Sequence, residues 1–223
     1  MKAVGNIGKI TKAMKMVAAS KMKGNLQRLE NGKHFGFNSI DMMFKSDIHM
    51  QKSTVDMPAS PKELLVPITT DRGLCGSINS GCFRGVRTYI NERDRSKIDI
   101  LCIGEKGAAA MKRPFADILR LNIMDIEAPY NFPMVMAVST HIQEQAESKD
   151  KIVVFYNEFK SAIAQVLRTV ELMPKHRFLE TVKDAKLYTA MAIPDTNTAN
   201  IAIYELYLSS NLWRCFLHNS CSE

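Results

Sequence analysis

Residues 64–80 read LLVPITTDRGLCGSINS and give the first indication of the fold. Their apolar beginning, Leu64–Thr69, is typical of a short buried strand. Two glycines, Gly73 and Gly76, then let the chain turn tightly. Helical spacing of the apolar residues follows over residues 78–92. A strand, a glycine-containing loop and a helix in this order predict the first unit of an α/β sheet.

The same alternation of strand and helix continues toward the C-terminus. We expect further strands at residues 98–103, 120–126, 152–156 and 162–172, and further helices at residues 106–112 and 132–147. Strands that alternate with helices in this way favour a Rossmann-like open sheet, largely parallel and covered by helices.

A long helix is predicted before this sheet, over residues 3–29. Its apolar residues are spaced 3, 4 and 3 apart, which is a heptad seam that packs against another helix. The seam consists of Ile7, Ile10, Met14 and Val17. At about 1.5 Å per residue this helix is about 40 Å long, which exceeds the interior of one small domain. Because an isolated helix is marginal in water, we expect it to need a partner.

After Gly24 the apolar residues of this helix lie on a different stripe, which suggests a second partner. Asn31, Gly32 and Gly36 are typical of a helix stop, but helical spacing resumes at Phe37, Ile40, Phe44 and Ile48. We therefore predict a helical arm over residues 1–49, followed by a linker at 50–62 that contains two prolines. The α/β domain is predicted at 63–173.

The rest of the chain is predicted to form a polar loop at residues 174–199 and a final helix at 200–223. This helix has an apolar side that includes Ile201, Tyr204, Leu208 and Leu212. We expect that side to pack against residues 37–48, so that the chain ends near the level of residue 32. The seam of the first helix would then have no partner within this chain.

The net charge of +7 is concentrated in the first helix. Residues 1–33 hold eight basic residues and one acid, which leaves 22 basic and 22 acidic residues elsewhere. A basic arm binds nucleic acid, anionic lipid or an acidic protein surface, although a solvated helix face is also possible.

The first helix carries no aromatic residue before Phe35 for base stacking or for insertion into a membrane. No apolar run is long enough to cross a bilayer. We interpret the lysine-rich start as mature protein, not as a transit peptide.

Residues 69–80 are where a nucleotide would bind in such a fold, but they lack both G-x-G-x-x-G and G-x-x-x-x-G-K-[ST]. Cys75 in this loop could be a nucleophile, but no histidine lies where a base is needed, and a packed thiol is favoured. His218 and Cys221 have the spacing of metal ligands without a second pair. Asp71 and Arg72 could serve recognition or cap the following turn. We expect no catalytic, cofactor or metal site.

Three segments are similar to signature segments of the ATP synthase gamma-subunit family. They are ITKAMKMVAASKM at residues 10–22, TTDRGLCGSIN at 69–79 and IYELYLSSNLW at 203–213. The resemblance covers nearly the whole chain. This sequence departs from the family pattern at both ends. A turn or two of helix is missing before residue 1, and the family continues through a long helix after Glu223.

The resemblance implies an antiparallel coiled coil of the N- and C-terminal helices inside a ring of three alpha and three beta subunits. The α/β domain then lies against the membrane c-ring and the small delta and epsilon subunits. Rotation of this shaft changes nucleotide affinity on beta, where ATP is made, so the chain needs no cofactor. The family's subunit contacts correspond to Lys9, Ile10, Lys12, Met14, Lys15, Arg72, Gly73 and Cys75.

The resemblance also implies a place in the cell. The chain lacks the inserted cysteine segment of chloroplast members, which favours the matrix side of the mitochondrial inner membrane, with the cytoplasmic side of a bacterial plasma membrane as the alternative. Two other functions stay open at this point. One is a basic-armed α/β enzyme that acts on a phosphorylated small molecule, and the other is a nucleic-acid-binding protein, for which we expect steeply salt-dependent binding.

Overall fold

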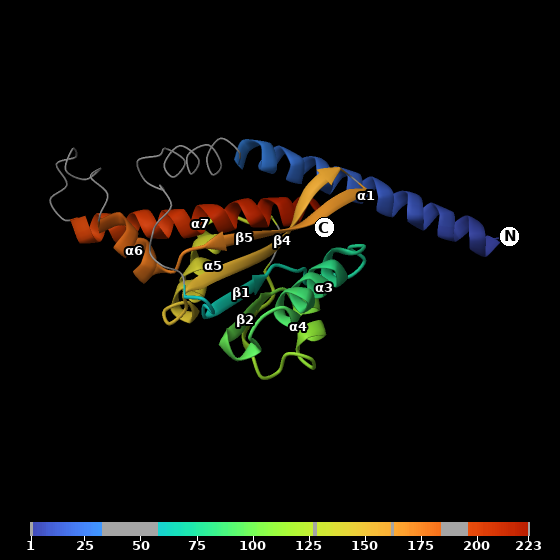
Figure 1. Cartoon of the computed structure of the whole chain (residues 1–223). Coiled ribbons are helices and arrows are strands. Elements are labelled where there is room, and N and C mark those ends of the chain that lie inside the picture. The colour runs from blue at the N-terminus through green and yellow to red at the C-terminus, as the bar shows by residue number, and fades with distance from the viewer. Residues whose placement is uncertain (1, 33–57, 127–128, 162, 184–195, 223) are drawn as a thin grey trace.

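The structure is a computed structural model that describes residues 2–32, 58–126, 129–161, 163–183 and 196–222. Figure 1 shows a long helix that projects from an α/β domain, with a second long helix lying across that domain. In chain order the elements are α1 (Lys2–Gly32), β1 (Glu63–Pro67), α3 (Ile78–Asn91), a short 3-10 helix (Arg95–Lys97), β2 (Ile98–Ile103), α4 (Glu105–Met111), β3 (Leu119–Ile123), α5 (Phe132–Gln145), β4 (Lys151–Ser161), β5 (Ala164–Leu172), α6 (Lys175–Lys183) and α7 (Thr196–Ser222).

The five strands form one sheet in the order β3-β2-β1-β4-β5. The first four strands are parallel, and β5 returns antiparallel to β4. The central strand β1 is buried along its whole length, as expected for a parallel strand with helices on both faces. Strand β4 pairs with β1 only as far as Phe155 and then continues to Ser161, so the β4–β5 hairpin extends beyond the sheet.

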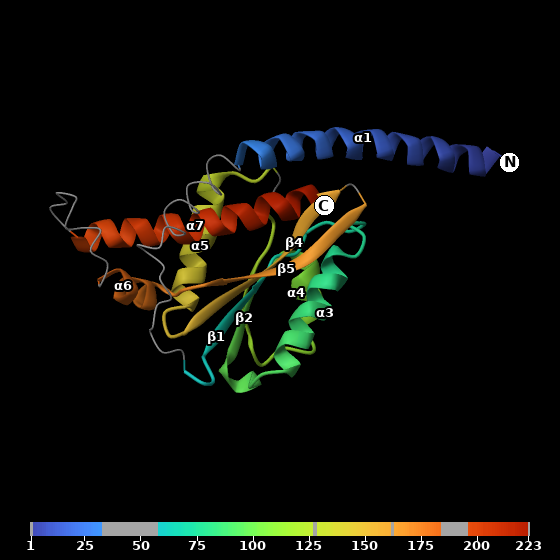
Figure 2. The same ribbon diagram turned by 45° about the horizontal axis from the view of Figure 1, so that its top comes forward.

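Helices cover both faces of the sheet, and alternate side chains of each strand supply the two cores. On β1, Leu64 and Val66 face α5, α6 and α7, whereas Leu65 faces α3 and α4. On β4, Val154 faces α5, α6 and α7, whereas Val153 faces α3 and α4. This follows from the two-residue period of a strand. Figure 2 shows α3 and α4 on one side of the sheet and α5 and α7 on the other.

The predicted strands and helices of the α/β domain are present, with boundaries that differ by a few residues. Two differences are larger. Strand β4 runs to Ser161, not to Tyr156. The segment predicted as a loop at 174–199 contains α6, because the ring of Phe178 stacks on Tyr207 of α7 and leaves Phe178 only 2% exposed. A polar stretch therefore becomes helical through one buried aromatic anchor.

The two long helices run in opposite directions where they meet. The side chain of Asn25 in α1 donates a hydrogen bond of 2.8 Å to the carbonyl of Ser220 near the end of α7. Further along α1, Leu29 is buried with Leu217 and Cys221. The last turn of α7 thus lies beside residue 25 of α1. The predicted level, residue 32, is about two helical turns further along α1.

The predicted partner of the final helix needs a correction. Tyr204, Leu208 and Leu212 are fully buried, but they belong to the core formed with the sheet, α5 and α6. The partners predicted for them at 37–48, with the rest of the arm beyond residue 32 and most of the linker, lie outside the described residues. The helix α7 is therefore part of the domain core as well as a neighbour of α1.

Candidate functional site: a subunit contact surface

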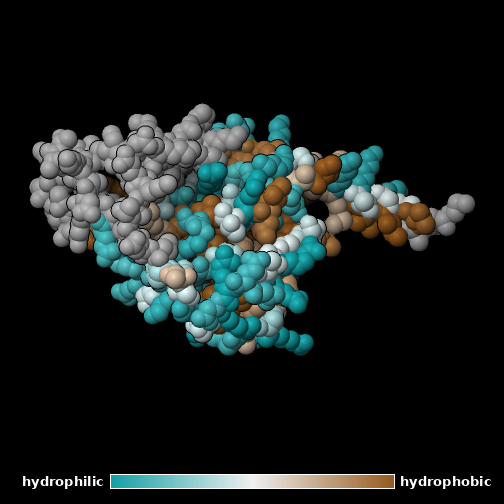
Figure 3. Space-filling view, viewed as in Figure 1, coloured by the Kyte–Doolittle hydropathy of each residue, from teal (hydrophilic) through white to brown (hydrophobic). Residues whose placement is uncertain are grey.

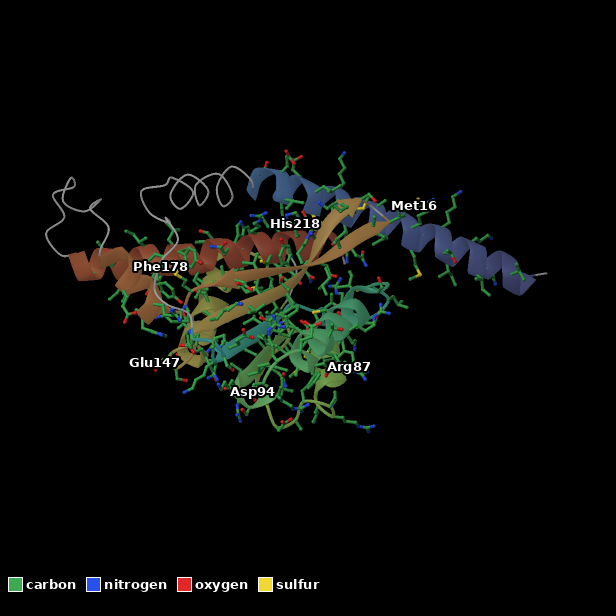
Figure 4. All side chains as sticks on the ribbon, viewed as in Figure 1. Met16, Arg87, Asp94, Glu147, Phe178 and His218 are labelled. Atoms are coloured by element: carbon green, nitrogen blue, oxygen red, sulfur yellow. The ribbon has the colours of Figure 1, made fainter. Side chains whose placement is uncertain are left out.

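The first half of α1 is a helix without a tertiary partner among the described residues. Every residue from Val4 to Lys21 is exposed, and the four seam residues are 56–63% exposed. These are the predicted seam Ile7, Ile10, Met14 and Val17. Figure 3 shows hydrophobic surface along this projecting stretch, and Figure 4 labels Met16 on it, which is 62% exposed. The prediction that the seam finds no partner in residues 200–223 is confirmed for the described residues.

Lysines line the same stretch of helix. Lys9, Lys12 and Lys15 are all exposed. Within the residues that the structure describes, none of these three ammonium groups pairs with a carboxylate. The arm therefore offers an apolar seam and unpaired positive charge together, which suits an acidic protein surface with apolar side chains.

A second exposed feature is the loop between β1 and α3. It follows the carboxyl end of the central strand, and in Figures 1 and 2 the start of α3 lies at the end of the domain from which α1 projects. The fold thus brings the loop and the arm, about 50 residues apart in sequence, to one end of the molecule. The loop holds three of the predicted contact residues. Arg72 and Gly73 are exposed, and Cys75 is half-buried.

Hydrogen bonds from polar side chains hold this loop in one shape. The Asn79 side chain accepts from the backbone N–H of Thr70 at 3.0 Å and donates to its hydroxyl at 2.8 Å. The Thr70 hydroxyl in turn donates to the carbonyl of Arg72 at 2.7 Å. Of the two glycines, only Gly76 has a left-handed backbone, with φ +58°. The guanidinium of Arg72 therefore extends from a braced turn.

Asp71 ties the loop to the start of α4 and to the segment that follows β3. One carboxylate oxygen accepts a 2.7 Å hydrogen bond from the backbone N–H of Glu105, the first residue of α4. The other accepts from the backbone N–H of Ile126, beyond β3, at 3.0 Å. In nucleotide-binding sheets a bound phosphate accepts such N–H groups at a helix start. Here the carboxylate of Asp71 already occupies them, which disfavours a phosphate at this position.

The cysteines lack the surroundings of a reactive thiol. Cys75 donates weakly to the carbonyl oxygens of Arg72 and Gly73, and neither can accept its proton to form a thiolate. Burial raises the pKa of Cys215 to about 12 and that of Cys221 to about 11, so both stay protonated at neutral pH. These contacts support the packed-thiol interpretation.

The described residues contain neither a metal-binding cluster nor a membrane-spanning helix. No group of three or more His, Cys, Asp or Glu side chains in them is arranged to hold a metal ion. None of the described helices has both the length and the apolar character of a bilayer-spanning segment.

Comparison with known proteins identifies the family. The family model described as ATP synthase matches residues 1–223. The chain belongs to the ATP synthase gamma-subunit family. It is 28% identical to the mitochondrial ATP synthase F(1) complex subunit gamma of Dictyostelium discoideum, over 99% of this chain and 72% of that protein. It is also 28% identical to the ATP synthase gamma chain of Pelagibacter ubique, over 99% of this chain and 79% of that one.

A chain in a solved structure of an ATP synthase central stalk has the same fold. A chain in the central stalk and c-ring structure of Tetrahymena thermophila mitochondrial ATP synthase superposes with a TM-score of 0.84 at 39% identity. The match covers 96% of this chain and 93% of that one. The resemblance inferred from three sequence segments is thereby confirmed. So is the mixed α/β fold with long N- and C-terminal helices.

The sequence of this gamma-family chain predicts Arg72, Gly73 and Cys75 as subunit contacts but does not reveal the hydrogen bonds that hold their loop in place. The sequence alone leaves recognition and capping both open for Asp71, and it does not mark Asn79. The signal was present as an Asx residue on each side of the glycine-containing turn, since such side chains bind nearby backbone groups. Their partners at Glu105 and Ile126 are distant in sequence and come from the fold alone.

Proposed function

We propose that this chain is the central rotating shaft of a proton-translocating ATP synthase and couples proton flow to ATP synthesis on the beta subunits. The observation that carries the proposal is the helical arm. It exposes an apolar seam and unpaired lysines, while the rest of α1 packs on the domain. Membership of the gamma-subunit family supplies a partner for this arm, the ring of three alpha and three beta subunits.

The energetics of the seam favour a protein partner. Full burial of an aliphatic side chain contributes about 1.5–3 kcal/mol. Because the seam residues are 56–63% exposed, more than half of that contribution is unused in the free chain. An apolar stripe along one helix face is best covered by another helix or by a closely fitting ring of subunits.

We infer that α1 and α7 form part of an antiparallel coiled coil. Their opposite directions and the buried contact of Leu29 with Leu217 support this. In that arrangement the seam from Ile7 to Val17 continues the helix pair toward the ring. The domain itself we assign as Rossmann-like, because the strand order β3-β2-β1-β4 and the parallel pairing match that sheet.

The subunit contacts follow from the two exposed features. We assign Lys9, Ile10, Lys12, Met14 and Lys15 of the arm and Arg72, Gly73 and Cys75 of the loop to the surface that faces beta. A carboxylate-rich loop on beta suits the charges. Met14 suits a surface that changes during rotation, because methionine is flexible and packs without one locked fit. Arg72 suits a carboxylate because its planar group bonds it through two N–H donors.

The α/β domain is proposed to lie against the c-ring and the small delta and epsilon subunits. Catalysis would take place on beta, with this chain contributing the asymmetric surface that sets the affinity of each nucleotide site. The complex is placed at the mitochondrial inner membrane, on its matrix side, with a bacterial plasma membrane as the alternative. The mitochondrial relatives support the first placement.

The test is the Arg72→Ala variant in the assembled complex. We expect the variant to fold and assemble, because the Arg72 side chain is exposed, but to pump fewer protons per ATP hydrolysed. Proton pumping by reconstituted vesicles, divided by the rate of hydrolysis, measures this directly. Normal coupling in a normally assembled variant would remove Arg72 from the contact surface.

The rival function, a basic-armed enzyme acting on a phosphorylated small molecule, has less support. Asp71 occupies the backbone N–H groups at the start of α4 and beyond β3 that a phosphate would need. Isolation from cells at low salt separates the two functions. The shaft purifies with alpha and beta subunits in a large complex, whereas the enzyme does not.

A further inference from the structure

Leu74, at the apex of the β1–α3 loop, has an unfavourable backbone conformation and an exposed side chain. Its φ is +65°, in the left-handed region that a leucine rarely adopts because its Cβ crowds the neighbouring carbonyl. The side chain is 95% exposed, so no burial offsets this strain. Glycine or asparagine suits such a position better. In the free chain, leucine is therefore an unfavourable residue here.

The surroundings of Leu74 keep it in place without covering it. The loop is braced before the apex by Asp71, which accepts hydrogen bonds from Glu105 and Ile126, and after it by Asn79, which bonds Thr70. An apolar side chain on such a fixed loop loses little conformational entropy when it binds a partner.

The apex is also open to an approaching surface. A Cβ atom added to Gly73 or to Gly76, on either side of Leu74, would meet no atom within 4 Å. Arg72, two residues before Leu74, is exposed on the same turn. An apolar side chain and a guanidinium thus extend together into open space. The matching partner surface is an apolar recess with a carboxylate at its rim.

We propose that Leu74 is the apolar anchor of this loop and inserts into such a recess on a beta subunit, where a rim carboxylate pairs with Arg72. The inference rests on the proposed function and adds a residue to the contact surface. It also gives a reason for the strained backbone, because the same side chain that destabilises the free chain stabilises the assembled complex.

The experiment compares Leu74→Asn and Leu74→Met with a control, Met136→Gln, in the full chain and in the reconstituted complex. Met136 is a 43% exposed apolar residue of α5, on the opposite face of the sheet from α3. We expect Leu74→Asn to unfold at or above the wild-type temperature, because asparagine tolerates the left-handed region. Its proton pumping per ATP should fall about threefold or more, as for a residue that anchors an interface. Leu74→Met, which keeps an apolar side chain, and Met136→Gln should retain coupling.

The outcomes separate this inference from the proposed function. Normal coupling in Leu74→Asn, together with defective coupling in Arg72→Ala, would overturn the anchor and leave the shaft intact. A clearly lower unfolding temperature for Leu74→Asn would also overturn it, because the leucine would then act within the chain. Failure of the wild-type chain to assemble with alpha and beta subunits would instead overturn the proposed function.

Discussion

The two long helices, α1 with 31 residues and α7 with 27, occupy opposite environments. In α7, Tyr204, Leu208 and Leu212 are fully buried in the domain core. In α1, every residue from Val4 to Lys21 is exposed. The difference follows their composition, because α1 carries a charged residue on almost every turn and α7 has a long stretch with few charges. It shows that an apolar stripe predicts burial, whereas only the fold shows whether the partner lies in the same chain.

The largest difference between the two helices is expected when one large apolar residue in each is replaced by alanine. Leu208→Ala in α7 should destabilise the isolated chain by about 2–5 kcal/mol, because a fully buried leucine is replaced by a cavity. Ile10→Ala in α1 should change the free energy of unfolding by no more than about 0.5 kcal/mol. Urea unfolding, monitored by the tryptophan fluorescence of Trp213 in α7, measures both. Equal losses would mean that α1 is packed in solution.

The contact between the two helices offers a second test. A Cβ atom added to Gly32 would lie 2.3 Å from a terminal carbon of Leu217 and 3.6 Å from the indole nitrogen of Trp213. Gly32→Val should therefore displace the buried side chain of Leu217 and destabilise the chain by about 1–3 kcal/mol. Gly24→Val lies about two turns earlier in α1 and has only the Arg28 guanidinium within 4.0 Å, so it is the matched control. If both variants unfold alike, the close approach at Gly32 is wrong.

Acid should affect the domain and leave the arm unchanged. Burial opposes ionisation of Asp99, yet hydrogen bonds from Lys149 and Arg120 hold the pKa of its carboxyl below the usual value. This contribution is present above the unfolded-state pKa of about 3.9 and is lost as the pH falls through the folded-state pKa. Asp99→Asn should remove that part of the acid sensitivity, at most about 1 kcal/mol for a partly exposed pair.

Unfolding in urea at pH 7, 5 and 3 tests this expectation. As far as Asp99 is concerned, the wild-type chain should be equally stable at pH 7 and pH 5. At pH 3 its free energy of unfolding should fall as the Asp99 carboxylate becomes protonated. Residues 4–21 contain no acidic or histidine side chain, so the helix content of the arm should not follow the same titration. If Asp99→Asn loses as much stability between pH 5 and pH 3 as the wild-type chain, the hydrogen bonds of Asp99 with Lys149 and Arg120 contribute nothing to the free energy of unfolding.

The smallest effect on folding belongs to Met14→Lys. Met14 is 56% exposed, so the variant should unfold with wild-type stability. In the complex, the added ammonium should form an ion pair with the carboxylate-rich loop of beta and reduce coupling. Pumping efficiency and rotation rate of the reconstituted complex measure it. Wild-type values for both would count against this contact.

The sequence was informative wherever its pattern has a local cause. Short apolar runs between helical segments predicted the strands of the sheet, and the heptad period predicted the exposed seam of α1. They did not predict α6, because a polar segment becomes helical only when Phe178 reaches Tyr204 and Tyr207 on α7. They also did not predict that the apolar side of α7 packs into the domain core, because an apolar stripe fits a sheet face as well as a second helix.

The contact residues were predicted from a resemblance, but the geometry that supports them was not. Arg72 and Met14 match signature segments, and both are exposed as a contact requires. The hydrogen bonds that fix the loop join Asp71 to residues 34 and 55 positions away, which no local pattern encodes. The conformation of Leu74 likewise depends on the whole turn, so it could be recognised only in the folded chain.

The exposed arm has a consequence for the lifetime of the protein before assembly. Residues 4–21 are held only by their own helical hydrogen bonds, and an isolated helix of that length opens readily in water. Proteases cleave such locally opened segments in proportion to the time they spend open. An orphan chain is therefore open to cleavage in this stretch, whereas a chain captured by its ring is shielded there. The helix that transmits rotation thus also limits the survival of copies that fail to assemble.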